Sequence, residues 1–272
     1  MSFSLYGDGP LYLRGAVENA RLVPIRYPGW TARFYVSEDI RQDLVAELEA
    51  LGAEIFRMHR RGRSDGMFWR FLAADDRQAD AAIFRDADSR ISQREVAAVS
   101  QWLASGKAFH IMRYHPNHNR PVMGVMWGVR RGALPPIPSR YRCWRRQHLF
   151  GADLGVPKID QTFLRATVNP TARYDSLVHS EFAWFEGESP RPFPEPSQAN
   201  GFIGQIVKAD GSTVPIHSER REQASRPLEP TPVPNHQLFS RPVQFVRGQL
   251  DQSSRAMNTG TPTTPENRGP DA

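Results

Sequence analysis

Two aspartates, Asp86 and Asp88, stand one residue apart directly after the apolar run 81–84. Carboxylates at positions i and i+2 past the end of a strand can offer oxygen atoms to a hard divalent cation such as Mg²⁺ or Mn²⁺. Such a cation would bridge the phosphates of a nucleotide and neutralise the charge that develops on a departing diphosphate. The alternative is an ordinary turn, because Asp favours turns and caps.

Other polar residues stand at similar positions. Tyr6 and Gly7 follow the first predicted strand, where they can stack on a nucleoside and approach it closely, or simply form a turn. Arg70 carries a guanidinium fork that suits phosphate oxygens, with a salt bridge to Asp75 or Asp76 as the alternative.

Alternating strands and helices must position these residues. Predicted strands cover residues 3–6, 31–36, 53–58, 81–85, 108–112 and 122–127, with a strand-like end at 177–179, and predicted helices cover 10–22, 37–51, 67–74, 92–105 and 160–167. This alternation predicts an α/β fold, a sheet with helices on both faces. In such sheets, ligands bind beyond the carboxyl ends of the strands, which is where the acidic pair stands.

Composition limits the possible classes. The chain has 272 residues, a formal charge of +6 and 39% hydrophobic residues, so it can bury a core and is not wholly disordered. The single cysteine, Cys143, excludes an internal disulfide and a four-cysteine zinc site. No apolar run approaches the ~18–20 residues that span a bilayer, and no secretory signal pattern opens the sequence. We therefore expect a cytoplasmic protein.

The sequence changes character near residue 220. Beyond it, prolines interrupt every periodic pattern, and the last twenty residues contain almost nothing apolar. Such a segment buries too little surface to offset the entropy of ordering it. We predict one domain over residues 1–222 and a mostly disordered, Pro-, Ser- and Thr-rich tail over 223–272.

Four segments in a fixed order resemble a known family. They are Phe68-Trp69-Arg70-Phe71-Leu72, Asp86-Ala87-Asp88-Ser89, Asp160-Gln161-Thr162-Phe163-Leu164 and Val178-His179. Together they look like the centre of a GT-A glycosyltransferase, similar to the glycogenin and bacterial lipopolysaccharide galactosyltransferase family. Segments 4–7, 33–36, 85–90 and 109–113 also resemble bacterial and viral capsule- or polysaccharide-type glycosyltransferases. The resemblance spans about residues 1–206.

The resemblance implies a single GT-A, Rossmann-like domain that binds a nucleotide-diphosphate sugar. It implies Mn²⁺ or Mg²⁺ as the cofactor, held by Asp86, Asp88 and His179. Arg70 would contact the diphosphate or ribose, and Asp86 would be a second metal ligand or a ribose contact. A histidine after an apolar strand can instead be a packed, hydrogen-bonded residue, which is the alternative for His179.

The same resemblance places Asp160 and Gln161 beside the sugar as catalytic residues. In retaining relatives the glutamine position lies near the anomeric carbon, so the resemblance favours a retaining glycosyltransferase. An N-cap aspartate followed by a solvent-facing glutamine is the alternative. Arg85 and Arg90 flank the acidic pair where relatives usually carry an apolar residue first, and Ser180-Glu181 replaces the expected residues after the histidine. Substrate and stereochemistry therefore stay open.

The sequence predicts a metal-dependent glycosyltransferase of the hexosyltransferase class, acting in polysaccharide biosynthesis, with a glycan, polysaccharide or lipid-linked hydroxyl acceptor. One alternative is a haloacid-dehalogenase-like phosphatase, in which the first Asp is the nucleophile. Against it, the pair lies well into the chain, and Arg90 occupies the place of an expected Thr or Val. The other alternative is a non-catalytic transferase-like protein that binds a glycan or a partner.

A basic, aromatic segment runs from Arg130 to Arg146, with Tyr141 and Trp144 among its arginines. It suits an anionic acceptor, a lipid diphosphate or an anionic membrane surface, and a solvated basic face is the alternative. Nucleic acid is disfavoured because no recognition motif accompanies the segment. The cytoplasmic protein would then contact the inner face of the membrane peripherally.

Overall fold

The structure is a computed structural model that describes residues 1–59, 65–115, 118–148, 158–195, 202–208, 210–213 and 231–233. The chain divides into two compact units, Met1–Pro234 and Asn235–Ala272, and every described residue belongs to the first. The predicted boundary at residue 222 and most of the predicted tail fall outside the described residues. Within the tail the structure describes only β9 (Thr231–Val233), which pairs in parallel with β8 (Ala183–Phe185).

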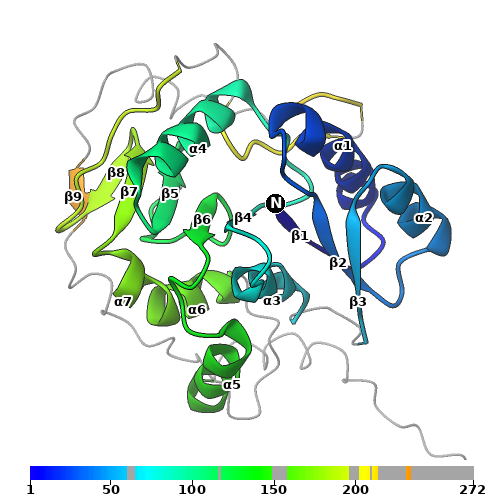
Figure 1. Ribbon diagram of the computed structural model, residues 1–272, viewed down its shortest axis with the longest axis horizontal. Coiled ribbons are helices and arrows are strands. Elements are labelled where there is room, and N and C mark those ends of the chain that lie inside the picture. The colour runs from blue at the N-terminus through cyan, green and yellow to red at the C-terminus, as the bar shows by residue number, and fades with distance from the viewer. Residues whose placement is uncertain are drawn as a thin grey trace, which may run out of the picture. The chain divides into compact units, whose positions relative to one another are not determined.

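A seven-stranded sheet forms the centre of the first unit (Figure 1). Its strands are β1 (Ser2–Leu5), β2 (Arg33–Ser37), β3 (Glu54–Met58), β4 (Ala81–Phe84), β5 (Phe109–Arg113), β6 (Trp127–Arg130) and β7 (Ser176–Ser180). Their spatial order is β3-β2-β1-β4-β6-β5-β7. Strand β6 runs antiparallel to β4 and β5, and the other neighbours pair in parallel.

Helices cover both faces of this sheet, which confirms the predicted α/β class. They are α1 (Pro10–Arg26), α2 (Gln42–Ala50), α3 (Gly66–Trp69), the 3₁₀ helix η1 (Arg70–Asp75), α4 (Gln93–Ser105), α5 (Ile137–His148), α6 (Ile159–Thr167) and α7 (Asn169–Ala172). Side chains from α1, α2 and α4 share one hydrophobic cluster with the sheet, and those from α3, η1, α5, α6 and α7 share another.

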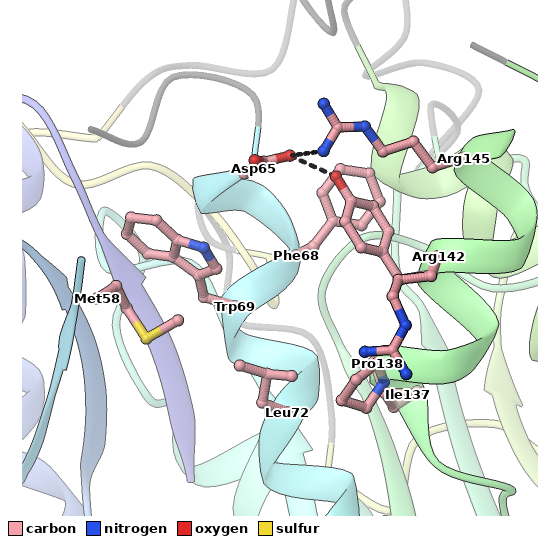
Figure 2. A pocket seen from close by; sticks show the side chains of 10 residues that line it. Met58, Asp65, Phe68, Trp69, Leu72, Ile137, Pro138, Arg142 and Arg145 are labelled. Carbon is pink, nitrogen blue, oxygen red and sulfur yellow. Dashed lines mark hydrogen bonds and ion pairs between the residues drawn. The ribbon is translucent and has the colours of Figure 1, made fainter. Parts of the chain in front are cut away.

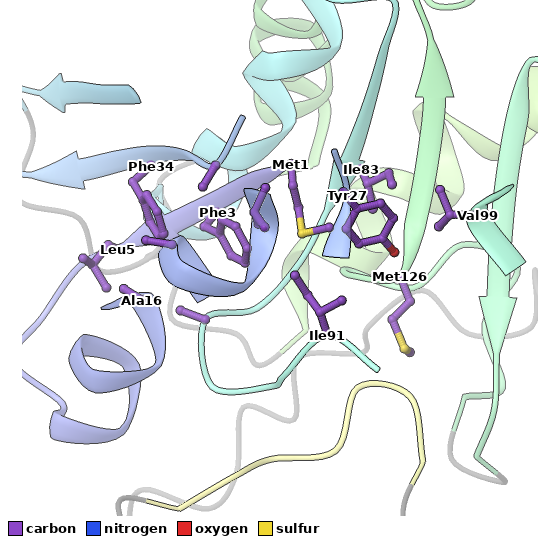
Figure 3. Close-up of a cluster of buried hydrophobic side chains, with 14 of the residues drawn as sticks. Met1, Phe3, Leu5, Ala16, Tyr27, Phe34, Ile83, Ile91, Val99 and Met126 are labelled. Carbon is purple, nitrogen blue, oxygen red and sulfur yellow. The ribbon is translucent and has the colours of Figure 1, made fainter. Parts of the chain in front are cut away.

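The alternation of side chains along the strands produces these two clusters. Phe3 and Leu5 of β1 lie in the first cluster, where Phe3 stacks on Phe34 with ring centroids 4.8 Å apart (Figure 3). The intervening serines of β1 face the other way. Ser2 Oγ donates to the backbone carbonyl of Arg70 (2.7 Å), and the Arg70 backbone N–H donates to Ser4 Oγ (2.9 Å). This buried polar pair fixes η1 over β1.

Two local predictions have clear outcomes. The helix predicted over 92–105 is confirmed, and it begins with a capping box in which Ser92 Oγ accepts from the Glu95 backbone N–H at 3.2 Å. The predicted helix start at Ser37 is wrong, because Ser37 is the buried last residue of β2 and pairs with Met58 of β3. Helix α2 begins five residues later, at Gln42. The ladder to β3 therefore overrode a favourable capping residue.

The strand predicted at 122–127 is also displaced. Strand β6 begins at Trp127 and ends at Arg130, and Met126 before it adopts a left-handed φ of 63°. In this sheet, Trp127 pairs opposite Phe84 of β4, with ring centroids 4.2 Å apart. Burial of a large aromatic pair against Phe71 sets this register, which a run of short apolar residues could not indicate.

Candidate active site

The turn that follows β4 carries the acidic pair, and α1 fixes its backbone. A Cβ atom on Gly15 of α1 would lie 2.0 Å from the Ala87 carbonyl oxygen, so only glycine permits this approach. Four residues along the same helix, Asn19 Nδ2 donates to the carbonyl oxygens of Ala87 (3.0 Å) and Ser89 (2.9 Å). The turn is thus held against a rigid helix rather than left as a mobile loop.

A buried ion pair anchors the turn from the α4 side. Arg85 Nη2 lies 3.1 Å from Glu95 Oε2 and 3.1 Å from Ser89 Oγ, and both charged side chains are almost fully buried. Burial raises the pKa of Glu95, and the charge of Arg85 opposes that rise. Arg85 therefore has a structural partner, which accounts for a charged residue where the resemblance predicts an apolar one.

Arg70 connects the turn to α6. Its Nη1 lies 2.5 Å from Asp86 Oδ1, and its Nη2 lies 2.9 Å from Asp160 Oδ2. The residue is 5% exposed. Burial alone would lower the pKa of Arg70, but the charges of Asp86 and Asp160 outweigh it and raise that pKa. Asp75 and Asp76 do not pair with Arg70: Asp75 accepts from the Ile137 backbone N–H, and Asp76 pairs with Arg33.

Asp160 lies in the first turn of α6, as predicted. Its Oδ1 accepts the Gln161 backbone N–H at 2.9 Å, and the side chain is buried. Burial raises the pKa of Asp160, with Arg70 acting in the opposite direction. A Cβ on Gly124 would lie 2.2 Å from Asp160 Oδ2, so the chain between β5 and β6 passes directly over this carboxylate. Gln161 is half-buried beside it.

The two carboxylates of the acidic pair have different surroundings. The Asp86 side chain is 40% exposed, whereas Asp88 is buried and accepts a hydrogen bond from the Tyr12 hydroxyl of α1. Burial, followed by the charge of Asp86, raises the pKa of Asp88 to about 6. The pair therefore concentrates negative charge that Arg70 only partly neutralises, and a cation placed there would be favoured.

Tyr6 and Gly7, the two residues predicted to contact a nucleoside, directly follow β1. Tyr6 packs its ring edge-on against Trp69, with centroids 6.1 Å apart, and a Cβ on Gly66 would lie 2.4 Å from the Tyr6 ring. Burial raises the pKa of Tyr6, while the charge of Arg70 lowers it. Gly7 adopts a φ of 73° and has open space where a side chain would be, so it is a turn residue at the margin of the cluster.

His179 has a different neighbourhood from the acidic pair. It is fully buried on β7, its Nδ1 lies 2.8 Å from His110 Nε2, and its Nε2 lies 3.0 Å from Gln101 Oε1 of α4. Both ring nitrogens thus already have protein partners. Burial, followed by the charge of Arg191, lowers the pKa of His179 to about 4. The structure shows a packed, hydrogen-bonded histidine, which is the alternative weighed from the sequence.

Tyr6, Arg70, Asp86, Asp88 and Asp160 are therefore brought together, with Gln161 adjacent, and His179 is bonded elsewhere. Among the described residues, no group of three or more His, Cys, Asp or Glu side chains is arranged to hold a metal ion. The donor set still suits Mg²⁺ or Mn²⁺, since Mg²⁺ is commonly bound by one or two carboxylates together with substrate phosphates and waters. Asp86 and Asp88 would be those two carboxylates.

Several residues of this site were not predicted from the sequence. Tyr12, Gly15 and Asn19 lie on one α1 helix, at spacings of three and four residues that place them on one face. The sequence signal that could have indicated them is a glycine and an asparagine on the face of α1 that carries its apolar residues. Gly124 gave a similar signal within an apolar run.

A late segment covers the other side of the acidic turn. The Val207 backbone N–H donates to the Asp88 carbonyl at 2.9 Å, and Ser89 forms a β-bridge with Ile206. Gly204, with a φ of 85°, packs against Met126, where a Cβ would lie 2.7 Å from the sulfur. The contacts of Ile206 and Val207 join residues more than a hundred positions apart to the acidic turn, and Gly204 joins the same segment to the residue before β6.

Comparisons with known proteins gave limited matches. No family model matches the sequence, and no curated protein matches it. Among solved structures, the fold is similar to a mycobacterial protein (17% identity, TM-score 0.33, covering 49% of this chain and 53% of that one). It is also similar to glucosyl-3-phosphoglycerate synthase from Mycobacterium tuberculosis in complex with uridine diphosphate (16%, TM-score 0.33, covering 49% and 57%). The matched region spans little more than half of those chains. Within the described part of this chain, no helix is both long and apolar enough to cross a membrane.

Proposed function

We propose that this protein is a metal-dependent glycosyltransferase that moves a sugar from a nucleotide-diphosphate donor to a hydroxyl acceptor. The observation that carries the proposal is the Arg70 guanidinium paired with both Asp86 and Asp160, with Asp88 near enough to feel the charges of Asp86 and Arg70. This cluster lies beyond the carboxyl end of the central strand β4, the edge at which α/β sheets bind ligands. The family resemblance of the four sequence segments points to the same chemistry.

Asp86 and Asp88 would hold Mn²⁺ or Mg²⁺ together with the donor diphosphate. When bound, the cation supplies Lewis-acid stabilisation to the leaving diphosphate. Burial, followed by the charge of Asp86, raises the pKa of Asp88, and a cation bound at this turn would offset both effects. His179 is left out of this ligand set because both of its nitrogens are already hydrogen-bonded.

Arg70 would orient the two sides of the site. Its hydrogen bonds to Asp86 and Asp160 use one donor on each Nη nitrogen, and a guanidinium carries five N–H donors in all. The remaining donors, including the buried Nε that has no partner among the described residues, can serve a phosphate oxygen. Arg70 would thus contribute positive charge to the leaving group while it keeps both carboxylates in position.

Asp160 and Gln161 would flank the sugar. They lie in the first turn of α6, beside Arg70 and Asp86. Gly124 packs so closely on Asp160 that a side chain at position 124 would clash with the carboxylate. Tyr6, packed edge-on against Trp69, would offer its ring to the nucleoside, and Gly7 would allow the backbone to approach it. This arrangement mainly positions reactants, which is a large part of catalysis in group transfer. A retaining outcome with Gln161 near the anomeric carbon belongs to the same proposal.

The test is nucleotide-sugar hydrolysis, because a glycosyltransferase can pass the sugar slowly to water. A panel of uridine- and guanosine-diphosphate sugars would be incubated with the protein and Mn²⁺, and released nucleoside diphosphate measured. We expect turnover of one donor, lost when Mn²⁺ is chelated. Asp88→Asn should lower the rate about a hundredfold or more, since removing one charged ligand costs several kcal/mol of leaving-group stabilisation.

Asp80→Asn is the matched control, because Asp80 is an exposed aspartate at the opposite end of β4. That variant should retain parental activity. Equal turnover in the Asp88 variant and the parent would contradict the site assignment. Phosphatase activity with covalent phosphate on Asp86 would favour the dehalogenase-like alternative. Glycan binding without metal-dependent nucleotide binding would favour the non-catalytic one.

A further inference from the structure

A separate pocket of about 310 Å³ opens between α3 and α5 (Figure 2). Apolar and aromatic side chains form most of its wall: Met58, Phe68, Trp69, Leu72, Ile137 and Pro138. Residues 68, 69 and 72 share one helical face, whereas Arg70 projects from another face toward Asp86 and Asp160. Helix α3 and its continuation η1 therefore serve two sites, the acidic cluster on one side and this pocket on the other.

Charge at the mouth of the pocket comes from α5 and Asp65. The Tyr141 hydroxyl donates to Asp65 Oδ1 at 2.5 Å, and Arg145 Nη1 lies 3.7 Å from the same oxygen. Figure 2 shows Arg145 and Asp65 together at one end and Arg142 beside Pro138 at the other. The negative charge of Asp65 is thus matched by Arg145, and the charge of Arg142 is left over.

Arg142 has no hydrogen bond or ion pair among the described residues, although it lines the pocket. Helix α5 carries four arginines and no Asp or Glu in its sequence IPSRYRCWRRQH. A ligand that enters this pocket therefore passes a net positive charge at the rim and then contacts apolar walls inside. Pockets that bind small molecules start at about 300 Å³, so the volume suits a small ligand or one end of a longer one.

We propose that this pocket binds an amphipathic phosphate, a phosphate ester of an apolar chain, with the chain against Leu72 and Trp69 and the phosphate at Arg142. A neutral apolar ligand would gain nothing from the exposed Arg142 guanidinium, and an organic cation would be repelled by it. Inorganic phosphate alone would leave the apolar wall in water. Burial of the chain and pairing of the guanidinium with phosphate together select this chemical class. The site is distinct from the proposed donor site.

The experiment is calorimetric titration of the full chain with decyl phosphate below its micelle concentration, with decanol and with inorganic phosphate. We expect decyl phosphate to bind at least about tenfold more tightly than decanol, the gain of one charge-assisted contact. Arg142→Ala should remove that difference and leave decanol binding unchanged. Leu72→Gln should weaken both alkyl ligands. Thermal unfolding would confirm that each variant is folded.

Arg146→Ala is the matched control, since Arg146 is an exposed arginine on the same helix that does not line the pocket. It should bind decyl phosphate like the parent. Equal loss in the Arg142 and Arg146 variants would indicate diffuse surface attraction and overturn the proposal. So would decyl phosphate binding no better than decanol, or its displacement by a nucleoside diphosphate, which would identify the pocket as part of the donor site. None of these outcomes depends on transferase activity.

Discussion

Two polar clusters near the same sheet differ in what they leave available. Around Arg70, the Asp86 carboxylate is 40% exposed, Asp88 carries a raised pKa, and Nε of Arg70 is unpartnered among the described residues. Around His179, the ring is fully buried and both nitrogens are hydrogen-bonded. The first cluster has spare charge and access to solvent, and the second has neither at His179.

Residue type alone does not separate these clusters. Aspartate and histidine are both common metal ligands, and here Asp86 follows the apolar strand β4 while His179 lies near the end of the apolar strand β7. The difference lies in coordination capacity: an imidazole whose two nitrogens are engaged in the core has none to offer. We conclude that unsatisfied charge with partial exposure, more than residue identity, distinguishes a candidate site from a structural polar contact in this protein.

The largest effect is expected when the cluster around Arg70 loses one carboxylate. Asp88→Asn should reduce metal-dependent turnover about a hundredfold or more and leave the protein folded. It should also raise the free energy of unfolding near pH 7.5 by on the order of 1–3 kcal/mol, because the raised pKa of Asp88 shows that its ionised form is unfavourable in the folded state. Activity would be followed by nucleotide release and stability by urea unfolding.

The opposite result is expected at the histidine. His179→Gln should leave turnover within about twofold and lower the free energy of unfolding by about 1–3 kcal/mol, the cost of disturbing buried hydrogen bonds. A variant that loses Mn²⁺-dependent turnover while staying folded would return His179 to the metal site and remove the contrast between the clusters.

The next largest effect is expected from pH: acid should lower the free energy of unfolding through the protonation of His179. The folded protein keeps the pKa of His179 near 4, whereas an unfolded histidine titrates near 6.5. The stabilising contribution is therefore complete above pH 6.5 and is lost as the pH falls toward 4. Between pH 6.5 and 5, the parent should lose roughly 2 kcal/mol more of its free energy of unfolding than His179→Gln does.

That difference is measured by urea unfolding of both proteins at each pH. Comparing the parent with the variant cancels other titrating groups, including Asp88, whose raised pKa acts in the opposite direction between about pH 6 and 4. His110 contacts His179, but burial is the main cause that holds the pKa of His110 well below its usual value, so we expect His110 to stay neutral in both proteins over this range. Identical pH slopes for the two would show that His179 is not held neutral by its surroundings.

Helix α1 offers a smaller test of how the acidic turn is held. Glycine to alanine inside a helix usually stabilises it by up to about 1 kcal/mol. At Gly15 the added Cβ would lie 2.0 Å from the Ala87 carbonyl oxygen, so Gly15→Ala should instead destabilise the protein by about 1.5 kcal/mol. Metal-dependent nucleotide binding should weaken as the turn shifts. Increased thermal stability would show that α1 does not pack as closely as described.

The smallest effect is expected from the hydroxyl that contacts Asp88. Tyr12→Phe removes one hydrogen bond to the carboxylate and keeps the ring. Because Tyr12 is 44% exposed, water can replace part of this bond, and we expect metal-dependent nucleotide binding to weaken only two- to fivefold, about 0.5–1 kcal/mol. Calorimetric titration with uridine diphosphate and Mn²⁺ would measure it. A loss as large as that of Asp88→Asn would make Tyr12 part of the ligand set.

Features of this structure that depend on residues close together in the chain could be predicted from the sequence. The alternation of strands and helices, the capping box at Ser92 and the acidic pair directly after β4 all depend on residues within a few positions of one another. Short-range patterns decide such features because backbone geometry repeats every two or 3.6 residues. The α/β class and the placement of the carboxylates at the sheet edge follow from them.

Contacts between distant residues were decided only by the tertiary structure. Arg70 meets Asp160 across ninety positions, and His179 meets His110 rather than the aspartates. The strand order, with β6 inserted antiparallel between β4 and β5, determines which side chains become neighbours. Such pairings depend on how whole strands and helices pack against each other, and burial then determines the charge each group can carry. A sequence names the chemical groups, but their partners follow from the packing.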